Sequence, residues 1–140
     1  LDFVQRLHDY FAERAADPAP RMLVGDLNIA PHPNDVWSHK QLLKIVSHTP
    51  QETEMLDRIR DEGGWSDLVR DKIPVEEKVF SWWSYRSRDW EASNRGRRLD
   101  HIWGSPTLKN DLANIQILQE ARGWEKPSDH VPIIAEFDLD

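Results

Sequence analysis

Arg97-Arg-Leu-Asp-His-Ile-Trp103 is the stretch of this sequence that decides the fold. Leu99, Ile102 and Trp103 supply the β-branched and aromatic side chains that are typical of a buried strand. A carboxylate inside such an apolar run is costly unless it has a partner, so Asp100 must be paired. The stretch therefore predicts a strand that carries one buried polar contact.

An imidazole is the natural partner for Asp100, because a carboxylate orients the ring and stabilises its protonated form. His101 is a poor candidate, since successive residues of a strand face opposite sides. His130 lies near the start of a later apolar run and faces no such restriction. We therefore predict that Asp100 pairs with His130.

The elements around this strand indicate an α/β layer structure with a mixed or antiparallel sheet, because helices lie early and strands late. Thr49-Pro-Gln-Glu52 is a capping box with proline at the first helical position, and Gly63-Gly64 ends the helix that it begins. The 21–25 run is short, apolar and followed by polar residues, which predicts a buried strand. The predicted elements are helices over 1–15, within 34–46 and over 50–62, and strands at 21–25, 79–83, 99–103, 115–118 and 131–137.

Length and composition fit one globular domain: the chain has 140 residues and no cysteine, which excludes a disulfide framework and thiolate chemistry. No run is long and apolar enough for a membrane span, and no signal-peptide pattern is present, so we expect a cytoplasmic protein. The chain begins with Leu1 rather than methionine. We therefore expect a processed, truncated or excised chain.

The net charge of −7 argues against a general nucleic-acid coat protein, but it suits an enzyme that gathers carboxylates around a cation. Basic residues are concentrated in one place. Residues 85–100 contain five arginines and three acidic residues. This stretch indicates a contact with an anionic polymer, and its alternative interpretation is a solvated loop. The arginines are Arg86, Arg88, Arg95, Arg97 and Arg98.

Two polar groups directly follow the first predicted strand, in Gly25-Asp-Leu-Asn28. Loops at the carboxyl ends of strands are where α/β proteins place ligands. Asp26 can orient or deprotonate a water, and Asn28 can donate an amide hydrogen to a phosphoryl oxygen. The alternative is an ordinary turn, because Asp and Asn are common turn residues.

Ser128-Asp-His130 precedes the last strand. The carboxylate of Asp129 offers hard oxygen ligands to a metal, and a protonated His130 can stabilise developing negative charge. A surface Asp-His pair is the alternative interpretation.

Aromatic residues cluster just before the arginines: Trp82, Trp83 and Tyr85 precede Arg86, and Trp90 precedes Arg95. Aromatic side chains between arginines suit stacking on bases while the arginines hold phosphates. Neighbouring strand residues face opposite ways, so one of Trp82 and Trp83 belongs to the core and the other is the candidate wedge. Three further histidines, His32, His39 and His48, lack the spacing of a metal site and are interpreted as solvated surface.

Four stretches in this order resemble the C-terminal half of the exonuclease III family of apurinic/apyrimidinic endonucleases, within the endonuclease/exonuclease/phosphatase superfamily. They are Gly25-Asp-Leu-Asn28, Phe80-Ser-Trp-Trp-Ser-Tyr-Arg-Ser87, Asn94-Arg-Gly-Arg-Arg-Leu-Asp100 and Pro127-Ser-Asp-His130. The wider superfamily shares the first and the last. The two middle stretches point to its DNA-repair branch.

The resemblance implies a hydrolase whose Asp26 positions the attacking water and, with Asp129, binds Mg2+ or Mn2+. It also implies that Asn28 binds the scissile phosphate and that Asp100 orients His130, which stabilises the transition state. The implied reaction is hydrolysis 5′ to an abasic site in double-stranded DNA, accompanied by 3′-exonuclease and 3′-phosphatase activity. The residues expected to contact DNA are Trp82, which lines the pocket for the base-free sugar, Tyr85, Arg86, Arg95, Arg97 and Arg98.

Family members are roughly twice this length, so the resemblance implies that residues 1–140 form one half of a four-layer α/β sandwich, one mixed sheet with flanking helices. The N-terminal half, which supplies further metal ligands, is absent, and we expect the isolated chain to be inactive. The other face of the sheet, with Met22, Val24, Ile133 and Ala135 or their alternates, is expected to be uncovered. We therefore expect the chain to dimerise or aggregate through that face.

Two other functions fit parts of the sequence. A phosphodiesterase acting on lipid or inositol phosphates would keep Asp26, Asn28, Asp129 and His130 but gives no reason for Trp82 beside an arginine-rich stretch. A non-catalytic DNA-binding module would use the arginines without the carboxylates. Its DNA binding would be insensitive to Asp26→Asn and to chelators.

Overall fold

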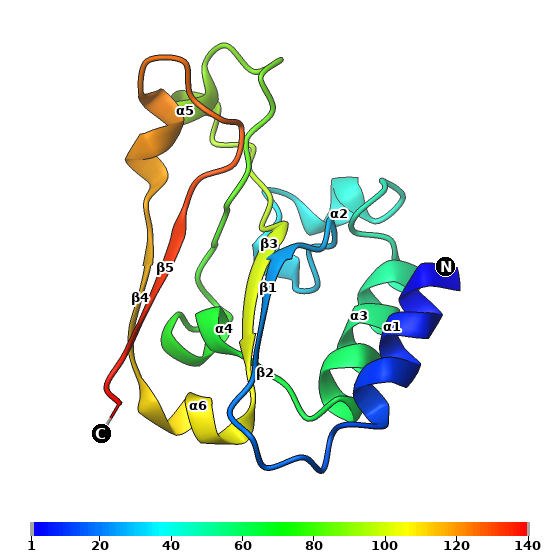
Figure 1. Cartoon of the computed structure of the whole chain (residues 1–140). Coiled ribbons are helices and arrows are strands. Elements are labelled where there is room, and N and C mark those ends of the chain that lie inside the picture. Colours follow the sequence, from blue (N-terminus) through cyan, green and yellow to red (C-terminus); the bar gives the residue numbers. More distant parts are fainter. Residues whose placement is uncertain (1, 140) are drawn as a thin grey trace.

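The computed structural model describes residues 2–139, and Leu1 of the first predicted helix lies outside them. Figure 1 shows the arrangement of the elements. The helices are α1 (Asp2–Ala12), α2 (His39–Leu42), α3 (Pro50–Glu62), α4 (Leu68–Lys72), α5 (Trp90–Ser93) and α6 (Pro106–Asp111), with 3-10 turns η1 (Pro33–Asp35) and η2 (Gln119–Gly123). The strands are β1 (Met22–Asp26), β2 (Ser66–Asp67), β3 (Asp100–Gly104), β4 (Leu112–Ile117) and β5 (Ile133–Phe137).

The predicted strand around Asp100 is confirmed as β3, the central strand of a three-stranded sheet in the order β1-β3-β2. Leu23 of β1 lies opposite Trp103 of β3, and both face a core with Leu56 and Ile59 of α3. Trp103 is 1% exposed. Figure 1 shows α1 and α3 side by side on one side of β1 and β3, and the β4–β5 ribbon on the other.

One mixed sheet was expected, and this was wrong for residues 2–139. The strands described there form two antiparallel sheets, β1-β3-β2 and β4-β5. No ladder joins β3 to β5 within these residues, and a pocket of about 390 Å³ adjoins both strands. Its walls include Val24, Ile102, Val131 and Ile133. The two sheets therefore stand beside one another without a shared ladder.

The capping box at the start of α3 is confirmed. The Thr49 hydroxyl accepts a hydrogen bond from the Glu52 amide, and the Glu52 carboxylate accepts one from the Thr49 amide. Both bonds satisfy amide groups that the first turn of a helix leaves without partners. The short helix expected within 34–46 is present as η1 and α2, two separate turns.

Residues 79–83 were predicted to be a strand and are not one. Their amides bond to three different segments: Val79 to the Asn34 carbonyl, Trp82 to that of Arg97, and Trp83 to that of Asp129. A strand needs one partner that continues in register, and no segment offers this. The residues form an extended link that ties separate loops together, with isolated bridges at Trp82.

β1 was predicted to be buried, but one of its faces is open. Met22 is 50% exposed and Val24 is 58% exposed, whereas Leu23 packs on the α1–α3 core. On β5 the exposed alternate is Ile134, at 39%, while Ile133 is partly buried. The expected uncovered face is therefore present on β1 and only in part on β5. No helix within residues 2–139 is long and apolar enough to cross a membrane.

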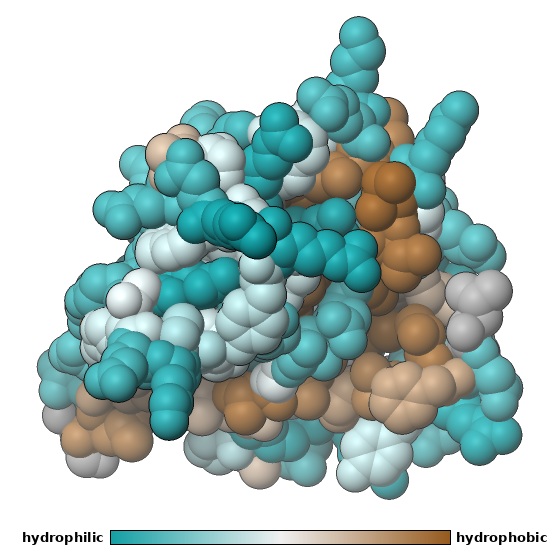
Figure 2. Space-filling view, turned by 90° about the horizontal axis from the view of Figure 1, so that it is seen from above, coloured by the Kyte–Doolittle hydropathy of each residue, from teal (hydrophilic) through white to brown (hydrophobic). Residues whose placement is uncertain are grey.

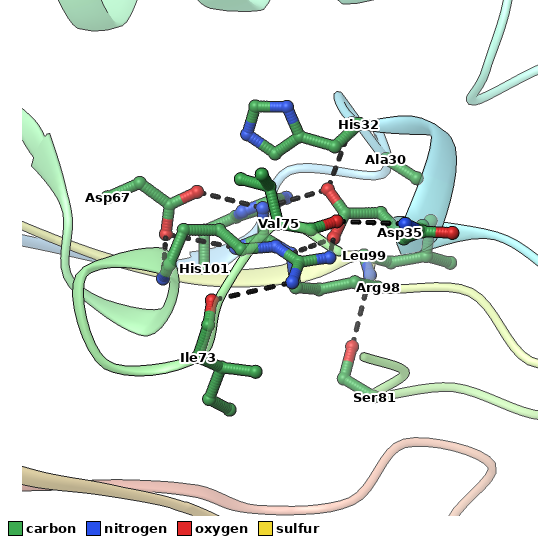
Figure 3. A network of polar contacts seen from close by, with 12 residues as sticks. Ala30, His32, Asp35, Asp67, Ile73, Val75, Ser81, Arg98, Leu99 and His101 are labelled. Carbon is green, nitrogen blue, oxygen red and sulfur yellow. Dashed lines mark hydrogen bonds and ion pairs between the residues drawn. The ribbon is translucent and has the colours of Figure 1, made fainter. Parts of the chain in front are cut away.

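Arg98 was expected to touch DNA, and the structure corrects this because the side chain is fully buried. Its Nε donates to Asp35 at 2.8 Å, and its two terminal nitrogens reach Asp35 and Asp67 at 2.8–3.0 Å (Figure 3). Arg70 adds a second guanidinium to Asp35 at 2.7 Å. Burial disfavours the charged carboxylates, but Arg98 outweighs it and holds the pKa of Asp35 and Asp67 below the usual range. The cluster joins η1, β2 and the start of β3.

Replacing Arg98 with Met should lower the free energy of unfolding by about 3 to 5 kcal/mol, because two buried carboxylates lose their main counter-ion. Urea unfolding followed by tryptophan fluorescence measures this. Arg88→Met at an exposed arginine is the matched control and should change stability by less than about 0.5 kcal/mol. Equal effects of the two substitutions would contradict the structural role of Arg98.

Candidate active site

Two carboxylates face each other at one end of the sheet. The antiparallel register of β1 and β3 places Asp26 directly opposite Asp100. Like charges at opposite positions of a strand pair repel one another, so this arrangement requires a cation between them. It is a costly arrangement for a surface of purely structural residues.

His130 supplies that cation. Its Nδ1 lies 2.8 Å from Asp100 Oδ2, and its Nε2 lies 3.7 Å from Asp26 Oδ2. The predicted pairing of Asp100 with His130 is confirmed. A backbone bridge between His130 and Trp82 fixes the residue ahead of β5.

The charge state of His130 follows from these neighbours. Burial favours the neutral ring, but the hydrogen bond and charge of Asp100, followed by the charge of Asp26, outweigh it. The pKa of His130 is therefore raised above 6.5. A group with a raised pKa contributes stability that is fully present below its unfolded pKa and is lost as pH rises through the folded pKa.

His101, the competing imidazole, turns to the other side of β3 as predicted. It is buried, and its Nε2 donates to the Ile29 carbonyl at 2.7 Å. Burial, and then the nearby Arg98 charge, lower the pKa of His101 to about 4. The two neighbouring positions, 100 and 101, thus place a charged pair on one face and a neutral ring on the other.

Sequence reasoning missed Ser81, which holds Asp100 in place. Its hydroxyl donates to Asp100 Oδ2 at 2.7 Å and accepts from the amides of Leu99 and Asp100 at 3.0 and 3.1 Å. The residue is fully buried. A small polar residue between Phe80 and Trp82, within an otherwise aromatic run, was the signal in the sequence that could have indicated a buried hydrogen bond.

Asp26 and Asn28 lie where a turn and a site coincide. The backbone N–H of Asn28 donates to Asp26 Oδ1 at 2.9 Å. Asn28 has a φ of 54°, a left-handed conformation that asparagine tolerates better than most residues. The turn interpretation is therefore confirmed, and the same turn is compatible with the predicted site. The turn leaves Asp26 Oδ2 directed at His130.

A pocket of about 440 Å³ adjoins His130 and Asn28. Trp82 and Leu99 form part of its wall. Trp83 is 1% exposed and belongs to the core, as predicted for one of the two tryptophans. Figure 2 shows hydrophobic side chains gathered on the side of α2 and the loop after it, beside a largely hydrophilic surface. The remaining lining residues are Ile45, Val46, Ser47 and Arg97.

The other predicted residues are not among those that line this pocket. Asp129, expected to bind a metal, accepts a hydrogen bond from the Trp82 indole at 3.1 Å and so orients that ring. Tyr85 is 58% exposed and its hydroxyl donates to the Pro127 carbonyl, while Arg86 is exposed. Arg95 lies over the Trp37 ring at 4.7 Å.

His48, interpreted as solvated surface, is buried, which corrects that interpretation. Its ring bonds to the Ala30 carbonyl and to His39, both at 2.7 Å. The contact is made by loops that converge only in the folded chain, so the spacing of the histidines could not reveal it.

Asp26, Asp100 and His130 each offer one ligand atom, all within 4.8 Å of one another. A divalent ion such as Mg2+ prefers carboxylate oxygens and retains several waters. Asp26 fits this role best, because Oδ2 of Asp100 is already hydrogen-bonded to both Ser81 and His130. The residues present could thus hold part of a magnesium coordination shell.

The imidazole of His130 should titrate above pH 6.5 in the metal-free chain, and Asp100→Asn should lower its pKa because the ring loses its charged partner. Histidine ring signals followed by NMR from pH 5 to 9 measure this. Glu136→Gln, on the exposed edge of β5, is the control and should leave the titration unchanged. A His130 pKa at or below 6.5 in the unsubstituted chain would contradict the charged pair.

A profile of the Endonuclease/Exonuclease/phosphatase family matches residues 1–130. The chain belongs to this family. Among family relatives, exodeoxyribonuclease III of Haemophilus influenzae is 35% identical over 141 residues, a region that covers 96% of this chain and 52% of the relative. The zebrafish DNA repair nuclease APEX1 is 32% identical over 114 residues, a region that covers 81% of this chain and 35% of the relative.

Solved structures agree. An AP endonuclease from Archaeoglobus fulgidus superposes with a TM-score of 0.92 at 29% identity and covers 99% of this chain and 53% of its own. A 3′ phosphatase from Neisseria, solved bound to a product DNA hairpin, has a TM-score of 0.90 at 28% identity. The match covers 99% of this chain and 52% of the phosphatase. The chain is therefore a mixed α/β fold that matches about half of each of these proteins.

Proposed function

We propose that this chain is the C-terminal half of a DNA-repair phosphodiesterase that hydrolyses the bond 5′ to abasic sites and also removes nucleotides or phosphate from 3′ ends. The observation that carries the proposal is the His130 ring held between Asp26 and Asp100 at the mouth of the Trp82 pocket. The relatedness to exodeoxyribonuclease III, to an AP endonuclease and to a 3′ phosphatase supports it.

The proposed roles follow from the geometry. Asp26, at the end of β1, orients and deprotonates the attacking water. His130, charged because of Asp100, hydrogen-bonds the phosphate oxygen on which negative charge develops, and Asn28 donates its amide to the same phosphate. Asp100 is a positioning residue, and Ser81 fixes its carboxylate. Together these groups can position a water molecule and the phosphate for in-line attack on phosphorus.

A bound Mg2+ or Mn2+ would neutralise charge on the phosphate and on the leaving oxygen. We propose that Asp26 supplies the contribution of this chain to its coordination. Asp129, which bonds to the Trp82 indole, would act on the metal only through more distant contacts.

The pocket favours nucleic acid over a lipid or inositol phosphate. Trp82 presents an aromatic face beside His130, and arginines at positions 86 and 95 are at the surface nearby in sequence. An abasic nucleotide has no base to pair or stack, so its sugar can leave the duplex at low cost and lie against an aromatic wall. The proposed substrate is therefore double-stranded DNA that carries an abasic site or a 3′ end.

We also propose that the open face of β1 and β3 receives the missing N-terminal half. Met22 and Val24 are exposed there, and a cavity of about 390 Å³ beside them is lined by Ile102, Val131 and Ile133. The related enzymes are about twice as long as this chain, which favours the missing half over a second copy as the partner. Asp26 and Asp100 stand at the edge of this face, so the partner would complete the site.

The chain mixed with a separately supplied N-terminal half of the Haemophilus influenzae relative should incise duplex DNA 5′ to one abasic-site analogue in Mg2+, whereas the chain alone should be inactive. Asp26→Asn or His130→Ala should reduce incision at least about 100-fold, because each removes a group that acts in the transition state. Gel electrophoresis of end-labelled strands measures the rate, and sedimentation establishes that the halves associate.

Arg6→Met, at an exposed arginine of α1 outside the arginine-rich stretch, is the matched control and should leave the incision rate unchanged. Associated halves that release phosphate from an inositol phosphate but leave the abasic duplex intact would support the lipid or inositol alternative. DNA binding without cleavage, unaffected by Asp26→Asn and by chelators, would support the binding-module alternative. Either result would contradict the proposal that the chain belongs to a repair nuclease.

A further inference from the structure

The pocket beside His130 contains a guanidinium, that of Arg97, for which residues 2–139 provide no counter-ion. Arg97 lines the pocket and is partly buried. Its Nε is shielded from solvent and has no hydrogen-bond partner, and the partners of its Nη1 are two uncharged oxygens, the Val46 carbonyl at 3.3 Å and Ser47 Oγ at 3.1 Å. Burial lowers the pKa of Arg97, since nothing beside it favours the charge.

The guanidinium is held in this position from several sides. It lies over the Trp82 ring at 5.4 Å, and the backbones of Arg97 and Trp82 exchange two hydrogen bonds of 3.0 and 2.9 Å. Ser47, which contacts it, has a φ of 88°, and its amide donates to Glu52 of the α3 capping box at 2.9 Å. The capped helix thus fixes the loop that carries one wall of the pocket.

A partly buried, unpaired charge is unfavourable unless a ligand completes it. Arg98, the next residue, shows the opposite solution, with two carboxylates around a fully buried guanidinium. A neutral base-free sugar in the pocket would displace water from the Arg97 guanidinium without supplying a negative charge to pair with it. An anionic group there would gain a charge-assisted hydrogen bond from the Arg97 guanidinium.

We propose that Arg97 is a specificity-determining residue that makes this pocket select 3′ ends whose terminal group carries an extra negative charge. This inference rests on the proposed phosphodiesterase function. With the 3′ phosphorus at Asn28 and His130, whatever lies beyond that phosphorus enters the pocket. A 3′-phosphomonoester brings its extra oxyanion there, and a 3′-phosphoglycolate brings a carboxylate.

The test compares nicked duplexes that differ only at the 3′ end of the nick. One carries a phosphoglycolate, one carries its hydroxyethyl phosphate analogue with an alcohol in place of the carboxylate, and one carries a phosphomonoester. Fluorescence anisotropy of the labelled duplexes with the full chain, in the presence of a chelator, measures binding without cleavage. The phosphoglycolate end should bind roughly tenfold tighter than the hydroxyethyl end, the usual scale of one hydrogen bond to a charged group.

Arg97→Leu should abolish this preference while leaving the affinity for the hydroxyethyl end within about twofold. Arg97→Lys keeps the charge and should retain part of the preference, which separates recognition from a general structural role. Arg88→Leu, at an exposed arginine, should leave the preference unchanged. Circular dichroism of each variant checks that the fold is intact.

Equal binding of the phosphoglycolate and hydroxyethyl ends would overturn the inference and leave the nuclease proposal standing. Equal weakening of all ends by Arg97→Leu would also overturn it. Absence of binding to every nicked duplex and to an intact abasic duplex would count against both proposals. A preference that is lost in Arg97→Leu and partly kept in Arg97→Lys would support the assignment.

Discussion

The buried guanidinium of Arg98 is the interaction on which the rest of this structure depends. It brings Asp35, from the loop after β1, and Asp67, from the end of β2, to the first residues of β3. Such a cluster is stable only when each charge has its hydrogen bonds, and here both carboxylates and Arg70 take part. Because Asp100 follows two residues later, the same contacts that close the core also fix where β3 begins.

Two neighbouring arginines illustrate how burial and partners decide the role of a charge. Arg98 is enclosed by carboxylates and acts within the fold, while Arg97 lines a pocket with an unsatisfied nitrogen. The same alternation separates Asp100 from His101 and Trp82 from Trp83. In each pair one side chain belongs to the core and the other faces the proposed substrate.

The open face of β1 relates the fold to the activity. Met22 and Val24 leave one side of the sheet exposed, and the family relatives extend well beyond the region that this chain matches. The candidate catalytic carboxylates stand at the edge of that face. In this arrangement, assembly of the second half and completion of the metal site would be the same event.

Several features could be predicted from local sequence because their causes are local. The capping box of α3 lies within four residues, the strand character of β3 within five, and the turn at Asp26 and Asn28 within three. The Asp100–His130 pair was also predictable, since a carboxylate within an apolar strand needs a partner and His101 faces away.

The sequence by itself thus determined which residues are candidates for the proposed chemistry: the carboxylates, the imidazole and the aromatic pocket wall. Only the tertiary structure decided which of them meet. It buried Arg98 against acids 31 and 63 positions away and turned Asp129 to the Trp82 indole. It also drew the amides of residues 79–83 to three separate segments instead of a strand. These contacts join segments far apart in the chain, and a one-dimensional pattern contains no signal for which distant groups will satisfy a buried charge or an unpaired amide.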